Sequence, residues 1–255
     1  MTATVDLNAD MGESYGPWVM GNDAEILKIV TSANIACGFH AGDPDVMAKT
    51  MQMAHDSGTG IGAHPGFADL QGFGRRRMSL PKDTLANMVA YQVAAATGMA
   101  TALGTRVRHL KLHGALANMA AEDAAMARTC YEAALRVAPD LIVMVLAGTE
   151  QEEAAKAMGA PRANEIFADR AYNDDATLVD RSLPHAMVHD PVIAGARMAR
   201  MVARGAIETH SGQWLPVPID TICLHGDGPE ALAIARAVKA HLAEAGVALK
   251  PFEGR

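Results

Sequence analysis

Short apolar runs that end in a glycine or a polar residue alternate along this chain with longer stretches of helical periodicity. Residues 4–10 alternate strictly, so that Asp6, Asn8 and Asp10 share one face of a predicted strand. Residues 141–146 are apolar without interruption, which is typical of a parallel strand buried on both faces. About seven such strand-then-helix units follow one another without a break in composition. The pattern therefore predicts an α/β fold.

Polar residues stand at the carboxyl end of nearly every predicted strand. They recur at residues 6–13, 34–44, 60–66, 109–114, 167–170 and 223–228. An open doubly wound sheet concentrates its site at one switch point, whereas a barrel brings all of its strand ends to one rim. We therefore expect a seven-stranded β/α barrel, TIM-barrel-like, formed as a single domain by residues 1–255. The tail at 250–255 is expected to be loose.

The sequence also indicates the local structure of four further segments. Asp43 and Pro44 form an N-cap signature directly after the strand that leads to His40. A helix is expected over residues 122–137, and a small hairpin over 208–217. The polar loop at 67–80 has the length of a lid or binding loop, and its Arg75-Arg76-Arg77 run suits either a solvated surface or anion binding.

Composition and charge exclude several classes of function. The net charge of the 255 residues is −7 and their only basic cluster is that arginine run, so nucleic-acid binding is not expected. No apolar run approaches the length of a membrane span, and no secretory signal opens the sequence, so we expect a cytoplasmic protein. Cys37, Cys130 and Cys223 lack the spacing of a disulfide framework or a structural zinc site.

Lys111 is the single residue that most strongly indicates a functional site. It shares one strand face with His109 and His113, and a lysine that points into a barrel is costly unless it is paired or used. The structural alternative is a salt bridge to an inward carboxylate such as Asp6. Both interpretations remain open from the sequence.

Other candidate groups are weaker. Residues 12–16 spell G-E-S-Y-G, but no helix is expected after them, so a hydrolase nucleophile elbow is rejected. Cys37 is interpreted as a buried residue rather than a nucleophile activated by His40 or His64. Surface positions are expected for five histidines: His55, His185, His189, His210 and His241.

Long blocks of this sequence resemble the LamB/YcsF family. They include residues 6–8, 12–14, 32–44, 62–66, 69–76, 113–116, 167–172 and 225–227. The resemblance implies a barrel like that of the polysaccharide deacetylases. It also implies the activity of the A component of an ATP-dependent 5-oxoprolinase, which opens 5-oxo-L-proline to L-glutamate together with two partner subunits, the B and C components. Four positions depart from residues common in the family: Ala9, Leu112, Ala117 and His185.

The implied chemistry can be assigned to residues of this chain. No phosphate-binding glycine loop occurs in the sequence, so ATP is expected to act through the partners. Asp10 or His64 is expected to deprotonate water, and Lys111 and His113 to stabilise the oxyanion or departing phosphate. Substrate-binding roles are expected for Asp6, Asn8, Glu13, Asn34, His40, Asp43, Asp169, Arg170, His225 and Asp227.

Two other classes of function remain open. One is a metal-dependent amidohydrolase or deacetylase of a small or carbohydrate substrate, in which Asp10, His40 and His64 form an Asp-His-His ligand set. The other is a non-catalytic binding protein of the complex that shelters a labile intermediate. Stoichiometric metal with chelator-sensitive activity would favour the first, and ligand affinity without a chemical step would favour the second.

Overall fold

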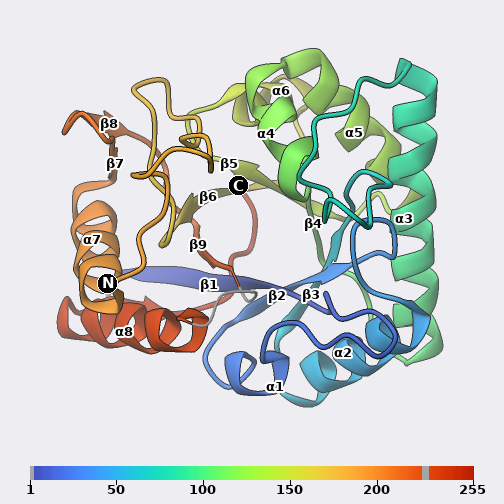
Figure 1. Cartoon of the computed structure of the whole chain (residues 1–255), viewed down its shortest axis with the longest axis horizontal. Helices are drawn as coiled ribbons and strands as arrows, with labels where there is room; N and C mark the ends of the chain where they lie inside the picture. The colour runs from blue at the N-terminus through green and yellow to red at the C-terminus, as the bar shows by residue number, and fades with distance from the viewer. Residues whose placement is uncertain (1–2, 226–229) are drawn as a thin grey trace.

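The computed structural model describes residues 3–225 and 230–255, and seven of its strands form one closed parallel barrel (Figure 1). Neighbouring strands follow in the order β1 (Thr4–Met11), β2 (Ser32–Ala36), β3 (Gly60–His64), β4 (His109–Lys111), β5 (Ile142–Leu146), β6 (Arg162–Phe167) and β9 (Thr221–Leu224). The barrel closes because β9 also pairs in parallel with β1, where Thr221 lies opposite Asp6. The predicted barrel is confirmed, and the open sheet is excluded.

Helices surround the barrel (Figure 1). They are α1 (Asp23–Ile26), α2 (Pro44–Asp56), α3 (Lys82–Ala102), α4 (Gly114–Glu122), α5 (Ala124–Val137), α6 (Glu150–Met158), α7 (Pro191–Arg204) and α8 (Ala231–Glu244). The helix expected at 122–137 is α5, whose N-cap is Asp123, whereas Glu122 ends the separate helix α4. Within the described ranges, no helix has both the length and the apolar character needed to cross a membrane.

The two faces of β1 have opposite chemistry. On β1 the residues Val5, Leu7 and Ala9 belong to the large hydrophobic core. The intervening Asp6 and Asn8 are fully buried and hydrogen-bond to side chains of other barrel strands. Apolar packing therefore lies on the outer face of the strand, and buried polar networks lie inside the barrel.

Two short pairings lie outside the barrel. β7 (Ala206–Glu208) and β8 (Trp214–Pro216) form an antiparallel hairpin, as the sequence predicts. β10 (Ala248–Leu249) runs parallel to the first residues of β1, ahead of the point where β2 begins to pair. This last pairing brings the C-terminal segment to the amino ends of the barrel strands.

The C-terminal tail is held in place, so the expectation that 250–255 are loose is wrong. Phe252 is buried in a cluster with Ile142, Met144 and Ala163. The backbone of Arg255 exchanges two hydrogen bonds with Arg162 at the start of β6. The tail therefore closes the barrel at the amino ends of its strands. The sequence did not reveal this, because one phenylalanine in a short polar segment does not indicate which hydrophobic site will receive it.

Replacing Phe252 by alanine is expected to lower the free energy of unfolding by about 3–5 kcal/mol, the usual cost of removing a buried phenylalanine. Urea denaturation measures this change. Glu253→Gln is a matched control, because its exposed ion pair with Lys250 is worth at most about 1 kcal/mol. Equal stability of the two variants would show that the tail contributes little.

Candidate active site

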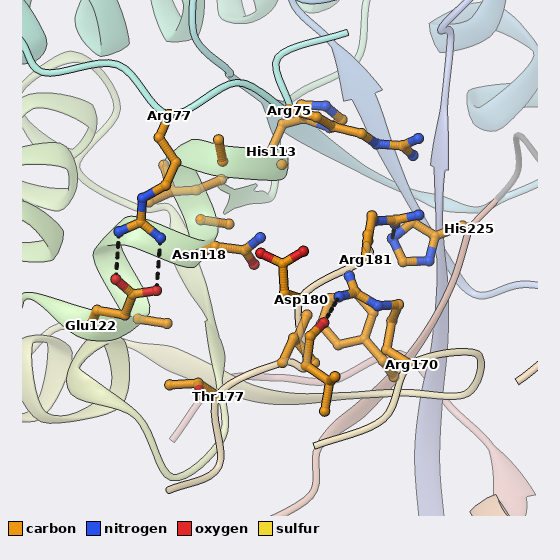
Figure 2. Close-up of a pocket in the computed structure, with 18 of the residues that line it drawn as sticks. Arg75, Arg77, His113, Asn118, Glu122, Arg170, Thr177, Asp180, Arg181 and His225 are labelled. Carbon is orange, nitrogen blue, oxygen red and sulfur yellow. Dashed lines mark hydrogen bonds and ion pairs between the residues drawn. The ribbon is translucent and has the colours of Figure 1, made fainter. Parts of the chain in front are cut away.

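A cavity of about 310 Å³ opens at the carboxyl ends of the barrel strands. Its lining contains six of the residues expected at the site, namely Asp10, His64, Lys111, His113, Arg170 and His225. Figure 2 shows Arg77 paired with Glu122 on one side of the cavity, while Arg170, Arg181 and His225 lie together on the other. Volumes near about 300 Å³ are at the lower end for small-molecule sites. The cavity therefore suits a small ligand.

Lys111 occupies the base of this cavity between two carboxylates. Its Nζ lies 2.8 Å from Asp10 Oδ1 and 3.0 Å from Glu165 Oε1. Cys223 Sγ is also 2.8 Å from Nζ. The salt bridge considered between Lys111 and Asp6 is not the one that forms. The sequence analysis did not select Glu165. The alternation of inward and outward residues that places Lys111 inside the barrel also predicts an inward position for Glu165 on β6.

The charges of this group follow from burial and pairing. Burial raises the pKa of Asp10, but the nearby His64 and Lys111 more than offset it and hold that pKa well below its usual range. Burial lowers the pKa of Lys111, but Asp10, Cys223 and Glu165 raise it well above its ordinary value. Burial also raises the pKa of Glu165. Asp10 and Lys111 are therefore both charged at neutral pH.

A hydrogen-bonded polar layer lies below the cavity. Asn34 Nδ2 donates to Asn8 Oδ1, and Asn34 Oδ1 lies 2.8 Å from His109 Nε2. Asp6 accepts hydrogen bonds from Thr31, Ser32 and Thr221. None of Asp6, Asn8 and Asn34 lines the cavity. The substrate-binding roles expected for these three residues do not fit their positions, and a structural role does.

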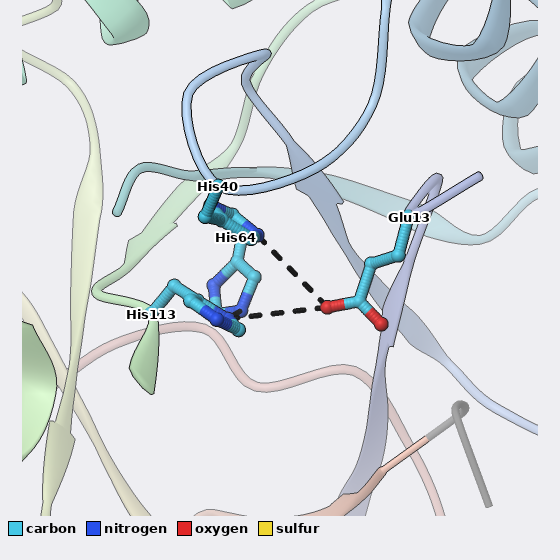
Figure 3. Close-up of side chains that lie close together, drawn as sticks. All are labelled: Glu13, His40, His64 and His113. Carbon is cyan, nitrogen blue, oxygen red and sulfur yellow. Dashed lines mark hydrogen bonds and ion pairs between the residues drawn. The ribbon is translucent and has the colours of Figure 1, made fainter. Parts of the chain in front are cut away.

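Beside the Lys111 group, four side chains meet at the ends of β1, β2, β3 and β4 (Figure 3). His113 Nδ1 lies 3.0 Å from His64 Nε2, and Glu13 Oε1 lies 3.9 Å from both His40 Nε2 and His113 Nδ1. The rings of His40 and His113 are stacked, with centroids 3.6 Å apart. All four residues are buried. We call Glu13, His40, His64 and His113 the imidazole cluster.

The imidazole cluster could hold a metal ion, because its four ligand atoms lie within 4.8 Å of one another. The sequence predicts a ligand set of Asp10, His40 and His64. The structure keeps the two histidines but replaces Asp10 by Glu13. Asp10 stays beside the cluster, with Oδ2 3.4 Å from His64 Nε2, while its Oδ1 accepts hydrogen bonds from Lys111 and Asn34.

The opposite side of the cavity contains a second histidine–carboxylate pair. His225 Nδ1 lies 2.7 Å from Asp169 Oδ2, and Arg181 donates to His225 Nε2 over 3.1 Å. Arg170 donates to the carbonyl of Val179 and lines the cavity. Asp227 lies outside the described residues. Asp169 therefore orients His225, and Arg170 presents positive charge to a ligand.

Some expected residues have local structural roles instead. Asp43 accepts hydrogen bonds from the backbone amides of Val46 and Gly16, so it caps α2, and it does not line the cavity; substrate binding by Asp43 stays a prediction. Arg76 pairs with Asp69, whereas Arg75 lines the cavity. The arginine run is therefore divided between a loop contact and the cavity wall.

The weaker candidates behave as the sequence suggests. Burial raises the pKa of Cys37 to about 12, which rules out a thiolate nucleophile at neutral pH. Ser14 Oγ exchanges hydrogen bonds with the backbone of Met20, and no helix follows it directly. Four of the five histidines expected at the surface are exposed, and the fifth, His241, is half-buried on α8.

With this geometry established, the chain can be compared with known proteins. The sequence profile of the LamB/YcsF family matches residues 5–255. The chain belongs to this family. The family resemblance inferred from the sequence is thereby confirmed. Two positions that depart from common LamB/YcsF residues, Leu112 and Ala117, line the cavity, whereas Ala9 lies in the core and His185 is exposed.

Individual relatives extend this LamB/YcsF assignment. A Ruegeria pomeroyi protein that is named as the A component of 5-oxoprolinase is 66% identical over 249 residues, which is 98% of either chain. The crystal structure of a lactam utilization protein from Thermus thermophilus matches with a TM-score of 0.91 and 42% identity, over 98% of this chain and 100% of that one. A family 4 carbohydrate esterase from Streptomyces lividans has a TM-score of 0.50 at 13% identity over 97% and 91% of the two chains, a likeness of fold alone.

Proposed function

We propose that this chain opens the lactam ring of 5-oxo-L-proline to give L-glutamate, as the A component of a cytoplasmic, ATP-dependent 5-oxoprolinase. The observation that carries the proposal is the convergence of Asp10, His64 and Lys111 on one small cavity. The names of the Ruegeria and Thermus relatives supply the substrate class.

The need for ATP follows from the chemistry of the substrate. A lactam is stabilised by resonance, so water attacks it readily only after the carbonyl has been activated. The sequence contains no phosphate-binding glycine loop. In this proposal the two partner subunits use ATP to activate the substrate, and this chain receives the activated molecule. The cationic groups Arg75, Arg170 and Lys111 in the cavity lining suit an anionic ligand of that kind.

Several residues of the site have a defined part in this proposed reaction. Asp10 is ionised and accepts the proton of the attacking water. The ammonium group of Lys111 stabilises the negative charge that develops on the oxyanion or on the departing phosphate, and His113 faces the same space. Arg170 binds the substrate carboxylate, and Asp169 positions His225 beside it.

A second candidate function is a metal-dependent amidohydrolase that works without ATP or partners. The imidazole cluster favours it, because three histidines and a glutamate are suitable ligands. A bound divalent ion would polarise the substrate carbonyl and lower the pKa of a nearby water. In the third alternative, a non-catalytic binding protein, substitution of Asp10 would change ligand affinity without a separate effect on the chemical step.

A glutamate-release assay tests the proposal. The chain, its two partner subunits, ATP and 5-oxo-L-proline are combined, and each component is omitted in turn. We expect glutamate only when all are present. Release by the chain alone, without ATP, would favour the amidohydrolase, and full release without this chain would refute the proposed role.

A further inference from the structure

We propose that Glu13, His40, His64 and His113 bind one divalent transition-metal ion of the zinc type. The inference deepens the proposed function, because the imidazole cluster adjoins the same cavity, and it rests on that function for its chemical purpose. The ligand set combines the ends of four neighbouring strands, β1 to β4, so it depends on the parallel pairing of these strands.

The first argument concerns the ring protons of His64 and His113. His64 Nδ1 lies 2.8 Å from the carbonyl oxygen of Lys111, and His113 Nε2 lies 2.8 Å from that of Phe73. A carbonyl oxygen only accepts hydrogen bonds, so both of these nitrogens carry the proton in a neutral ring. The remaining nitrogens, His64 Nε2 and His113 Nδ1, then direct lone pairs at each other across 3.0 Å. Two facing lone pairs repel each other unless a cation, either a proton or a metal ion, lies between them, and His64 Nε2 also lies 3.4 Å from Asp10 Oδ2.

The second argument concerns His40. Its side chain is fully buried, and neither ring nitrogen makes a hydrogen bond. A buried polar group without a hydrogen bond costs about 1–3 kcal/mol. The ring fits in this position because two neighbouring residues are glycines. A Cβ on Gly66 would lie 2.6 Å from His40 Nδ1, and one on Gly74 would lie 2.7 Å from His40 Cβ. A metal bond to Nε2, the nitrogen that faces Glu13, would satisfy one of these two buried nitrogens.

The distances fit one shared ion. In a tetrahedral site, metal–nitrogen bonds of about 2.1 Å place ligand atoms about 3.4 Å apart, so the 3.0 Å between His64 Nε2 and His113 Nδ1 would widen slightly on binding. Glu13 Oε1, at 3.9 Å from two of the imidazoles, needs to move inward by less than about 1 Å to join them. Hydrogen bonds from ligand imidazoles to backbone carbonyls, as at Lys111 and Phe73, are typical of the supporting contacts of metal sites.

The donor set selects the type of metal. Three imidazoles and one carboxylate suit zinc, cobalt, nickel or iron, whereas calcium and magnesium prefer sites made of oxygen atoms. With Nε2 of His64 bound to a metal, that ring has no nitrogen left to accept a proton. Of the two candidate bases, Asp10 and His64, only Asp10 could then deprotonate water.

The test is a titration of the chelator-treated full chain with Co²⁺ and Zn²⁺, without a polyhistidine tag. We expect one ion per chain, visible absorption from bound Co²⁺, displacement by Zn²⁺ and a higher melting temperature on binding. Glu13→Gln is expected to weaken Co²⁺ binding at least about tenfold, and His40→Asn is a second ligand variant. The double variant His185→Asn/His210→Asn is the matched control, because those rings also lie together but at the surface.

Two results would overturn the inference. One is the absence of stoichiometric metal binding. A proton shared between His64 and His113 would then explain the short distance between their nitrogens. The other is equal binding by the wild type and both ligand variants. The two proposals fail separately. A chain that binds no metal but still supports glutamate release refutes only the metal site, and a metal-binding chain that supports no release refutes only the function.

Discussion

Replacing Lys111 by methionine is expected to abolish glutamate release and to lower the free energy of unfolding by about 3–5 kcal/mol. Methionine keeps most of the volume but removes the charge that lies between Asp10 and Glu165. Two buried carboxylates would then share one site without a cation. Urea denaturation measures the loss of stability, and the reconstituted assay measures the loss of activity.

A double variant separates the two effects of that substitution. Lys111→Met/Glu165→Gln carries one buried negative charge fewer, so it should recover part of the stability and none of the activity. A Lys111→Met enzyme that is folded and releases glutamate within about tenfold of the wild-type rate would show that the ammonium group does not act in the reaction.

Asp10→Asn is expected to reduce kcat for glutamate release by about 10²–10⁴-fold, the usual contribution of a positioned base. The fold should be retained. Asparagine can still accept the hydrogen bonds from Asn34 and Lys111, and Glu165 remains 3.0 Å from the lysine as a second partner. Steady-state kinetics with the partner subunits, together with the melting temperature, measure both expectations.

Asp6→Asn is the matched control for that experiment. Both aspartates project from the same face of β1 into the barrel, and both substitutions remove one carboxylate. Asp6 contacts threonine and serine side chains below the cavity, so its replacement should change stability but not the kcat of the folded fraction. Comparable losses of kcat in the two variants would argue against a specific role for Asp10.

The barrel could be predicted from the sequence because its signal is repeated. Each strand ends in a similar way, and seven weak indications of the same kind agree with one another. Single features were harder to predict. Helix α4 begins at Gly114 directly after His113, and the segment is alanine-rich on every side, so it has little amphipathic periodicity. The position of Phe252 depends on the far end of β5, a contact between residues distant in sequence.

The candidate site shows a similar limit. Period-two spacing correctly places Lys111 and Asp10 inside the barrel, where they meet at 2.8 Å. The same spacing does not show how far along the barrel axis each residue lies. It therefore groups Asp6 and Asn34 with the residues of the cavity, although both lie below the cavity. The same limit explains why the sequence predicts Asp10 rather than Glu13 as a metal ligand. The pattern of a single strand does not show that Asp10 pairs with Lys111.

The opposite chemistry of the two faces of β1 has a consequence for engineering. Val5, Leu7 and Ala9 lie in the hydrophobic core and Asp10 faces Lys111 inside the barrel, so a library confined to the inward positions of this strand leaves its outer apolar packing unchanged. Such a library must keep the electrical balance of the interior. Lys111, Asp10 and Glu165 are best exchanged together, as one set of paired charges, when a new substrate is sought.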